Sequence, residues 1–218
     1  MKVLWIANRE LRSIFNTAVG WLVLTAFLLI TGVFWVIMVD TYVTQSNDLV
    51  HNPYMAQQMN LTDFLLLPFF GNCTIIVLMV TPALSMRLFA EEFKQHTMEL
   101  LFTSPVSTVE IVLGKFLGAV GYLAVLLLCT AHYPISLAWY GDPEPGVLLG
   151  GYTGLLLLGS AIVSMGMLFS AFTSNQIVAS VLTFGAALTL YILSFNEMDP
   201  DSFLNQLSLS SHVVDLLR

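Results

Sequence analysis

The chain has 218 residues, of which 57% are hydrophobic and only 10% are charged. A soluble domain averages about 25% charged residues, so no soluble fold of this size hides so much apolar surface. The formal net charge of −7 is not spread evenly, because the charged residues gather between long uncharged tracts. A helix needs roughly 20 apolar residues to cross a bilayer. The composition therefore excludes a soluble globular domain and predicts an integral membrane protein.

The N-terminal segment, residues 1–16, mixes apolar and polar side chains at helical spacing. Val3, Leu4, Ile6 and Leu11 are apolar, whereas Arg9, Glu10 and Arg12 are charged. Such a pattern is typical of a helix that lies in the membrane interface. We expect residues 1–16 to form an interfacial helix, and its expected anchoring residues are Trp5, Arg9, Glu10 and Arg12.

Long uncharged tracts follow, and they predict five membrane spans. The first, residues 17–39, is too long for the apolar region of a signal peptide and has no small-x-small cleavage site after it. The others are residues 64–86, residues 116–140, and residues 145–196, which the polar triplet Thr173-Ser174-Asn175 divides into two spans. Because the tracts are continuously apolar and do not alternate with period two, the prediction is an all-α polytopic membrane protein and not a β-barrel.

Basic residues orient the chain, because Lys and Arg prefer the cytoplasmic flank of a span. Six of the seven lie before the first span or between the second and third. Nine of the fourteen acidic residues lie on the opposite side. We therefore expect the N-terminus in the cytoplasm.

The segment between the second and third spans, residues 87–115, is expected to begin with a charged amphipathic helix. Its two faces would be Phe89, Phe93, Thr97 and Leu100 on one side and Glu91, Glu92, Gln95 and Glu99 on the other. Thr103-Ser104-Pro105 would end this helix, and the Ser107/Glu110 spacing of a capping box would start the next one. Two interpretations remain open: a passive interfacial helix, or a docking element for a cytoplasmic partner to which Glu92 and Glu99 would be exposed.

The predicted spans lack the residues that are typical of catalytic, ion-conducting or metal-binding sites. None has an acidic or basic residue near its middle, which argues against an ion pump, a secondary transporter or an intramembrane hydrolase. Gly114-Lys115 lacks the first Gly and the Ser or Thr of a phosphate-binding loop. Neither the two cysteines nor the four histidines have the spacing of metal ligands. The sequence therefore predicts no catalytic site, no metal site and no cofactor in this chain.

Two further features concern packing and the C-terminal segment. Gly114 and Gly118 would allow a second helix to approach closely, either within the chain or across a dimer. Residues 196–218 have an amphipathic pattern and are expected to lie along the outer interface.

Three stretches of sequence carry a family resemblance. They are REL at 9–11, LFAEEFKQHTMELLFTSPVSTVEIVLGKFLGA at 88–119, and SNQIVA at 174–179. With these stretches the chain resembles the permease subunits of ABC-2 type ABC transporters, and most closely those associated with gliding motility. The resemblance implies a single transmembrane domain over residues 1–218, in a bacterial cytoplasmic membrane, with a sixth span in the full family.

In that family the segment between spans two and three is the coupling helix that fits into the ATPase subunit. Carried over residue by residue, the expected coupling residues are Glu91, Glu92, Lys94, Thr97, Glu99, Leu100, Thr103 and Pro105. The resemblance also implies two copies of a cytoplasmic ATPase, which would bind ATP and Mg²⁺. It implies a second permease as well, identical or related, which in the gliding branch often has a soluble extracytoplasmic domain. No nucleic-acid partner is expected.

Two functions follow from the resemblance. The chain would be an exporter permease, or a non-transporting transducer or scaffold that acts on cell-wall or motility partners outside the membrane. A membrane enzyme is the weakest alternative, because no set of nucleophile, base or metal ligands was found.

Overall fold

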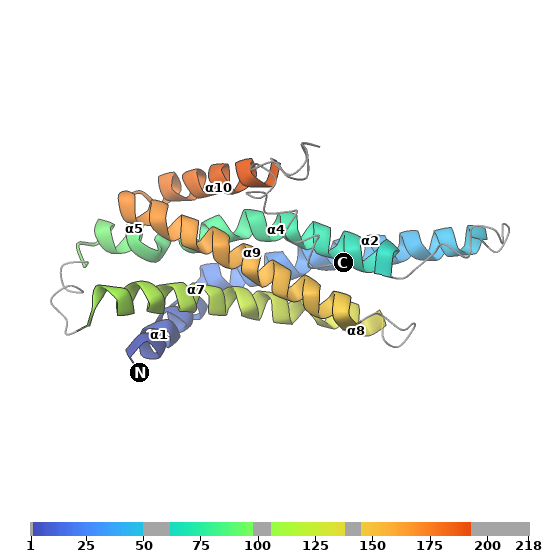
Figure 1. Cartoon of the computed structure of the whole chain (residues 1–218), viewed down its shortest axis with the longest axis horizontal. Helices are drawn as coiled ribbons and strands as arrows, with labels where there is room; N and C mark the ends of the chain where they lie inside the picture. Colours follow the sequence, from blue (N-terminus) through green and yellow to red (C-terminus); the bar gives the residue numbers. More distant parts are fainter. Residues whose placement is uncertain (1, 50–61, 98–105, 138–144, 193–218) are drawn as a thin grey trace, which may run out of the picture.

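The computed structural model describes residues 2–49, 62–97, 106–137 and 145–192. Every regular element within these ranges is a helix. In chain order they are α1 (Lys2–Asn16), α2 (Ala18–Leu49), the π-helix η1 (Thr62–Leu66), α4 (Leu67–Ser85), α5 (Arg87–Lys94), α7 (Thr108–Thr130), α8 (His132–Leu137), α9 (Pro145–Phe172) and α10 (Gln176–Ile192). Figure 1 shows them as an elongated bundle, with α1 and α5 at one end and the last turns of α2 at the other.

Four helical stretches are long and apolar enough to cross a membrane. They are Ala18–Asn47, Phe64–Lys94, Thr108–Leu137 and Pro145–Phe172, and the shorter apolar helix Gln176–Ile192 follows them. The prediction of an all-α polytopic membrane protein is confirmed. The predicted division at 173–175 is also correct, because Asn175 Oδ1 accepts the Ile177 N–H at 3.0 Å and so caps the start of α10. The expected tail, residues 196–218, lies outside the described residues.

The first span, α2, is longer than its uncharged tract. Its 32 residues correspond to about 48 Å of helix, whereas the hydrocarbon core of a bilayer is about 30 Å thick. The uncharged part ends before Asp40, and the helix continues past that residue to Leu49. Figure 1 shows this part of α2 extending beyond the other helices. A charge marks where a helix leaves hydrocarbon, but it does not end the helix.

Aromatic and small residues form the main core of the bundle. Trp35 of α2 meets Phe69 of α4 edge to face, with ring centroids 5.2 Å apart. Gly159 of α9 lies so close to α7 that a Cβ atom there would be 2.3 Å from Leu123 Cδ2. Because these contacts join residues far apart in the sequence, α2, α4, α7 and α9 form one packed unit.

The N-terminal helix packs against α7 along one face. A Cβ atom on Gly114 would lie 2.6 Å from Ile6 Cβ, and one on Gly118 would lie 2.7 Å from Glu10 Cβ. The two glycines therefore serve packing within the chain, which was one of the two alternatives that their spacing left open. At its other end α1 turns into α2 at Thr17, whose hydroxyl donates to the Ile14 carbonyl at 2.8 Å.

Candidate functional site

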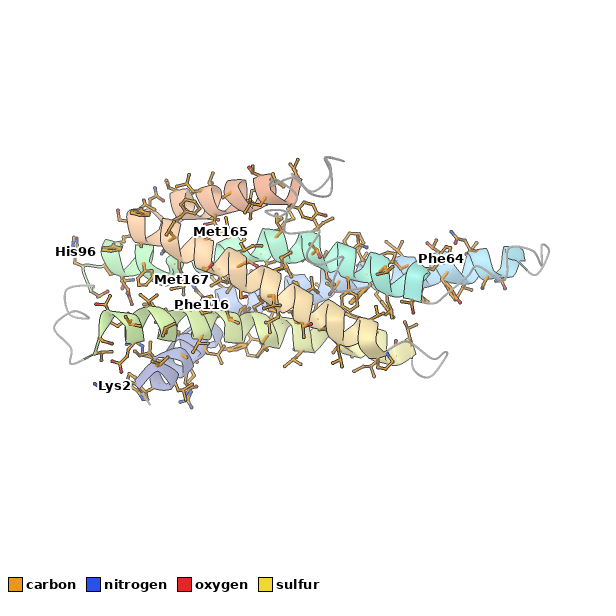
Figure 2. The ribbon with its side chains drawn as sticks, viewed as in Figure 1. Lys2, Phe64, His96, Phe116, Met165 and Met167 are labelled. Carbon is orange, nitrogen blue, oxygen red and sulfur yellow. The ribbon has the colours of Figure 1, made fainter. Side chains whose placement is uncertain are left out.

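The candidate site lies at the end of the bundle that holds α1, α5 and the first turns of α7, which we call the basic end. Lys2, Arg87, Lys94 and Lys115 all belong to these helices. Figure 2 shows Lys2 and His96 at this end and Phe64 near the opposite one.

Helix α5 continues the second span and is not a separate loop helix. α4 ends at Ser85, and α5 starts two residues later at Arg87. At the interruption, the Met86 N–H still donates to the Pro82 carbonyl at 3.0 Å, so the backbone stays helical there. Phe64–Lys94 is accordingly one continuous spanning stretch. A displacement of α5 is therefore passed directly to the second span.

Ser170 of α9 stabilises the interruption at Met86. Its hydroxyl accepts hydrogen bonds from the backbone N–H groups of Phe89, at 3.0 Å, and Ala90, at 2.9 Å. It donates to the Met86 carbonyl at 2.9 Å. Ser170 is fully buried. One buried side chain thus contacts three backbone groups at the junction of α4 and α5.

The end of α5 differs from the predicted position. The amphipathic helix was expected to run to Thr103-Ser104-Pro105, but α5 ends at Lys94. His96 takes a positive φ of 55°, and the Thr97 N–H bonds back to the Glu92 carbonyl at 3.1 Å. This backbone pattern ends helices without help from proline, and glycine usually takes the place of His96. The expected helix end was wrong, because the left-handed residue His96, and not Pro105, ends α5.

The apolar face of α5 is buried over part of its length. Leu88, Phe89 and Ala90 are buried against α9 and α7. Phe93 lies one turn after Phe89 on the same face of α5, and its side chain is 37% exposed. The apolar face is therefore buried at Phe89 and reaches the surface at Phe93.

Three charged side chains meet at the basic end and form what we call the Lys115 cluster: Glu10 of α1, Glu92 of α5 and Lys115 of α7. The Lys115 Nζ lies 2.7 Å from Glu92 Oε1 and 3.1 Å from Glu10 Oε1. It also lies 5.5 Å from the centre of the Phe89 ring. The expectation that Glu92 faces the cytosol or a partner is not met, because its side chain is only 19% exposed and is paired with Lys115.

Burial makes the Lys115 cluster sensitive to the position of each helix. The Lys115 side chain is 3% exposed, and the Glu92 Oε2 atom is buried without a hydrogen-bond partner within the described part of the chain. Breaking a buried ion pair costs several kcal/mol, because the remaining charge is left without compensation. Movement of α5 away from α7 therefore either carries α7 along or leaves charges unpaired.

The start of α7 agrees with the predicted capping box. The Ser107 N–H donates to Glu110 Oε2 at 2.9 Å, and the Glu110 N–H donates to Ser107 Oγ at 3.3 Å. This cap fixes where α7 begins and so places Lys115 two turns into the helix, opposite Glu10 and Glu92.

The predicted coupling residues fall into three groups. Lys94 is exposed, whereas Glu91, Glu92 and Thr97 are half-buried. Glu99, Leu100, Thr103 and Pro105 lie outside the described residues. On α1, Trp5, Arg9 and Arg12 are exposed, whereas Glu10 points into the Lys115 cluster.

Sequence reasoning missed two residues of the site, Lys115 and Ser170. The sequence analysis used Lys115 to orient the chain and compared it with a phosphate-binding loop, but it did not predict an ion pair for it. Its position immediately before a long uncharged tract was a usable signal, since a cation at such a boundary often pairs with a neighbouring carboxylate. Ser170 gave no signal, because a serine in an apolar helix is common.

Among the described residues, no three His, Cys, Asp or Glu side chains gather as metal ligands would. What the arrangement offers is mechanical, because one lysine connects α1, α5 and α7, and one serine connects α5 to α9.

Comparison with protein families identifies a family that covers most of the chain. The family described as "ABC-2 family transporter protein" matches residues 36–210, which is most of the chain. No curated protein and no solved structure matches.

Proposed function

Since the chain belongs to the ABC-2 family of transporter proteins, we propose that it converts ATP hydrolysis in a separate ABC ATPase into movement of its own membrane helices. The chain is a multi-pass, non-catalytic permease component of an ABC transporter. The family also implies a partnership with an ABC ATPase. Our proposal concerns the route by which movement passes through the helices and the arrangement of the subunits.

The Lys115 cluster is the observation that carries the proposal. A force on α5 has two routes into the bundle, one through Met86 into α4 and the other through Glu92 and Lys115 into α7. Glu10 extends the second route to α1. Because the charges are buried, the three helices are coupled more strongly than surface ion pairs would couple them.

The ATPase would contact the exposed side of α5 and the segment that follows it. Lys94 and Phe93 are exposed there, and Glu91 and Thr97 are half-buried. Glu99, Leu100, Thr103 and Pro105 keep the docking role that the family resemblance implies. Glu92 receives a different role, because it positions α5 against Lys115 and does not contact the partner.

The full assembly is proposed to contain two permeases and two ATPases, in the cytoplasmic membrane of a bacterium. The N-terminus and the basic end would face the cytoplasm, where the ATPases bind ATP and Mg²⁺. If the chain belongs to the gliding-motility branch, the second permease would be a related protein with a soluble extracytoplasmic domain.

Export of a substrate is the first candidate for the work performed. A non-transporting transducer is the second, and in that case a companion protein outside the membrane would receive the movement.

Affinity purification of the tagged chain from native membranes in mild detergent tests the proposal. We expect an ATPase with a phosphate-binding loop at a stoichiometric amount, as identified by mass spectrometry. An extracytoplasmic protein recovered with it would favour the transducer. Recovery of the chain alone, also after crosslinking, would contradict the coupling proposal.

A paired set of variants makes this test specific to α5. Phe93→Asp with Lys94→Glu places two acidic side chains on exposed positions of α5 and should reduce recovery of the ATPase at least tenfold. Val43→Asp with Thr44→Glu makes the same kind of change on exposed positions of α2 and should leave recovery unchanged. Equal recovery with both double variants would remove α5 from the docking surface.

A further inference from the structure

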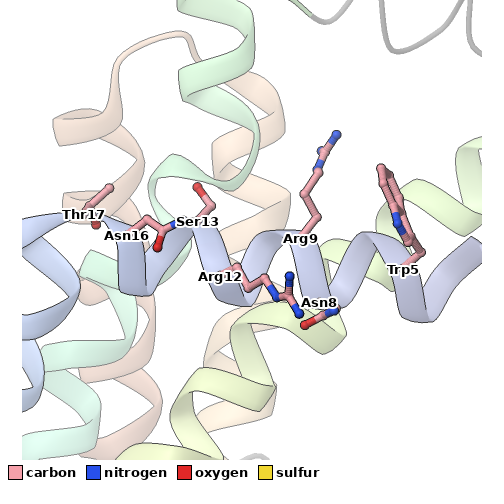
Figure 3. A pocket seen from close by; sticks show the side chains of 7 residues that line it. All are labelled: Trp5, Asn8, Arg9, Arg12, Ser13, Asn16 and Thr17. Atoms are coloured by element: carbon pink, nitrogen blue, oxygen red, sulfur yellow. The ribbon is translucent and has the colours of Figure 1, made fainter.

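We propose that the outer face of α1 binds the headgroup of an anionic phospholipid. A shallow groove of about 490 Å³ runs along this face, within the range of about 300–1,000 Å³ that small-molecule sites span. Its lining includes Trp5, Asn8, Arg9, Arg12, Ser13 and Asn16. Figure 3 shows Trp5 and Arg9 extending to one side of α1, while the side chain of Arg12 runs toward Asn8.

The contacts of α1 place this groove at the level of lipid headgroups. Its last residue, Asn16, is followed almost at once by the uncharged part of α2, which starts at Ala18. On its other side, α1 packs against α7 around Gly118. Gly118 comes three residues after Lys115, which is the last charged residue before the apolar part of α7. Three residues of helix rise about 4.5 Å. Both neighbouring spans therefore place α1 at the boundary of the hydrocarbon.

Charge on the outer face favours an anion. Arg12 has no ion-pair or hydrogen-bond partner among the residues that the structure describes. Arg9 approaches Glu10 at 3.3 Å, but the same Glu10 oxygen lies 3.1 Å from Lys115. Lys115 also pairs with Glu92 at 2.7 Å, so these two cations and two carboxylates balance, and Arg12 leaves the outer face with an excess of positive charge. Residues three apart are neighbours on a helix, and guanidinium groups bind phosphate through paired hydrogen bonds.

The surroundings of the groove favour a lipid over a soluble phosphate. Trp5 is 67% exposed at a level where tryptophan is enriched in membrane proteins. Beyond the corner at Thr17, the exposed side chains of Trp21 and Leu22 continue on α2 as an apolar surface. A phosphate held by Arg9 and Arg12 would therefore have its acyl chains lying along the start of the first span. Asn8, Ser13 and Asn16 would offer hydrogen bonds to headgroup oxygens.

Native mass spectrometry of the full chain in detergent tests this site. The purified chain is titrated with phosphatidylglycerol, and separately with the zwitterionic phosphatidylcholine, and bound lipid is counted. We expect tighter binding of phosphatidylglycerol, and Arg9→Gln with Arg12→Gln should weaken that binding about tenfold or more. Phosphatidylcholine binding should change less than twofold. Both arginines are exposed, so unchanged thermal melting would show that the fold is kept.

A single-charge control separates a built site from general attraction. Arg12→Gln should weaken phosphatidylglycerol binding several-fold, whereas Lys94→Gln, on the exposed side of α5, should leave it unchanged. Equal losses for the two variants would overturn the proposal, because any surface cation would then serve. The proposal would also be overturned if the double arginine variant lost binding of both lipids equally, or if it lost no phosphatidylglycerol binding. Displacement of the lipid by equimolar glycerol phosphate would also overturn it, because acyl chains would then contribute nothing.

None of these results depends on an ATPase. A lipid site on α1 could be disproved while the coupling proposal holds, and the reverse is also true.

Discussion

Lys115 and its two carboxylate partners respond differently to removal, because Lys115 pairs with both carboxylates, whereas Glu10 has a second cation, Arg9, at 3.3 Å. Lys115→Met leaves the half-buried Glu92 without a cation and Glu10 with Arg9 alone, and we expect the free energy of unfolding to fall by about 3 kcal/mol. Glu10→Gln or Glu92→Gln leaves one balanced pair and should cost about 1 kcal/mol. Unfolding by SDS titration in mixed micelles measures both effects.

A triple variant gives the control for this prediction. Glu10→Gln, Lys115→Met and Glu92→Gln together remove every charge of the cluster and should restore most of the stability lost in Lys115→Met. If the triple variant were as unstable as Lys115→Met, the loss would come from packing and not from uncompensated charge.

Ser170 offers a second test at the scale of one residue. Ser170→Ala leaves the buried Phe89 N–H without its serine acceptor and the Met86 carbonyl without its serine donor, which should cost about 1–3 kcal/mol. Ser164→Ala on the same helix is the matched control, because the Ser164 hydroxyl is exposed and bonds only to the Ala161 carbonyl one turn earlier. Thermal melting in detergent should show a lower midpoint for Ser170→Ala alone, and equal midpoints would contradict the role of the serine.

At the scale of elements, the packing of α1 on α7 depends on two glycines. Gly114→Ala with Gly118→Ala would push α1 away from α7, since the new methyl groups would lie under 3 Å from Ile6 and Glu10 atoms. We expect a lower melting temperature and faster proteolysis at the N-terminus.

Gly71→Ala with Gly185→Ala provides the comparison for the glycine variants. Neither position has an atom within 4 Å of the added methyl group, and alanine is favoured over glycine in a helix by up to about 1 kcal/mol. This pair should keep or raise the melting temperature. A decrease as large as that in the Gly114/Gly118 variant would show that glycine itself, and not the close approach, matters.

Elements with local signals were predictable from the sequence, and those set by distant contacts were not. The spans follow from uncharged length, and the start of α7 follows from Ser107 and Glu110, which lie one turn apart. The end of α5 depends on a left-handed His96, for which histidine is an uncommon choice. The direction of Glu92 depends on Lys115, 23 positions along the chain, and no helical pattern contains that information.

At the scale of the whole molecule, the distribution of charge predicts which end faces the cytoplasm. In a background with Cys73 and Cys129 replaced by alanine, Lys94→Cys reports on the basic end and Thr44→Cys on the far end of α2. A membrane-impermeant maleimide should label Thr44→Cys in right-side-out vesicles and Lys94→Cys in inside-out vesicles. The reversed labelling pattern would invert the proposed orientation and remove α5 from the reach of a cytoplasmic ATPase.

The bond between Ser170 and the interruption at Met86 divides the second span into two arms of unequal length. The 19 residues of α4 extend about 28 Å to one side of this point, and the 8 residues of α5 extend about 12 Å to the other. If the two helices tilt together about Ser170 as a fulcrum, the far tip of α4 travels about twice as far as the tip of α5. A displacement of about 2 Å at the basic end would then become about 4–5 Å on the other side of the membrane.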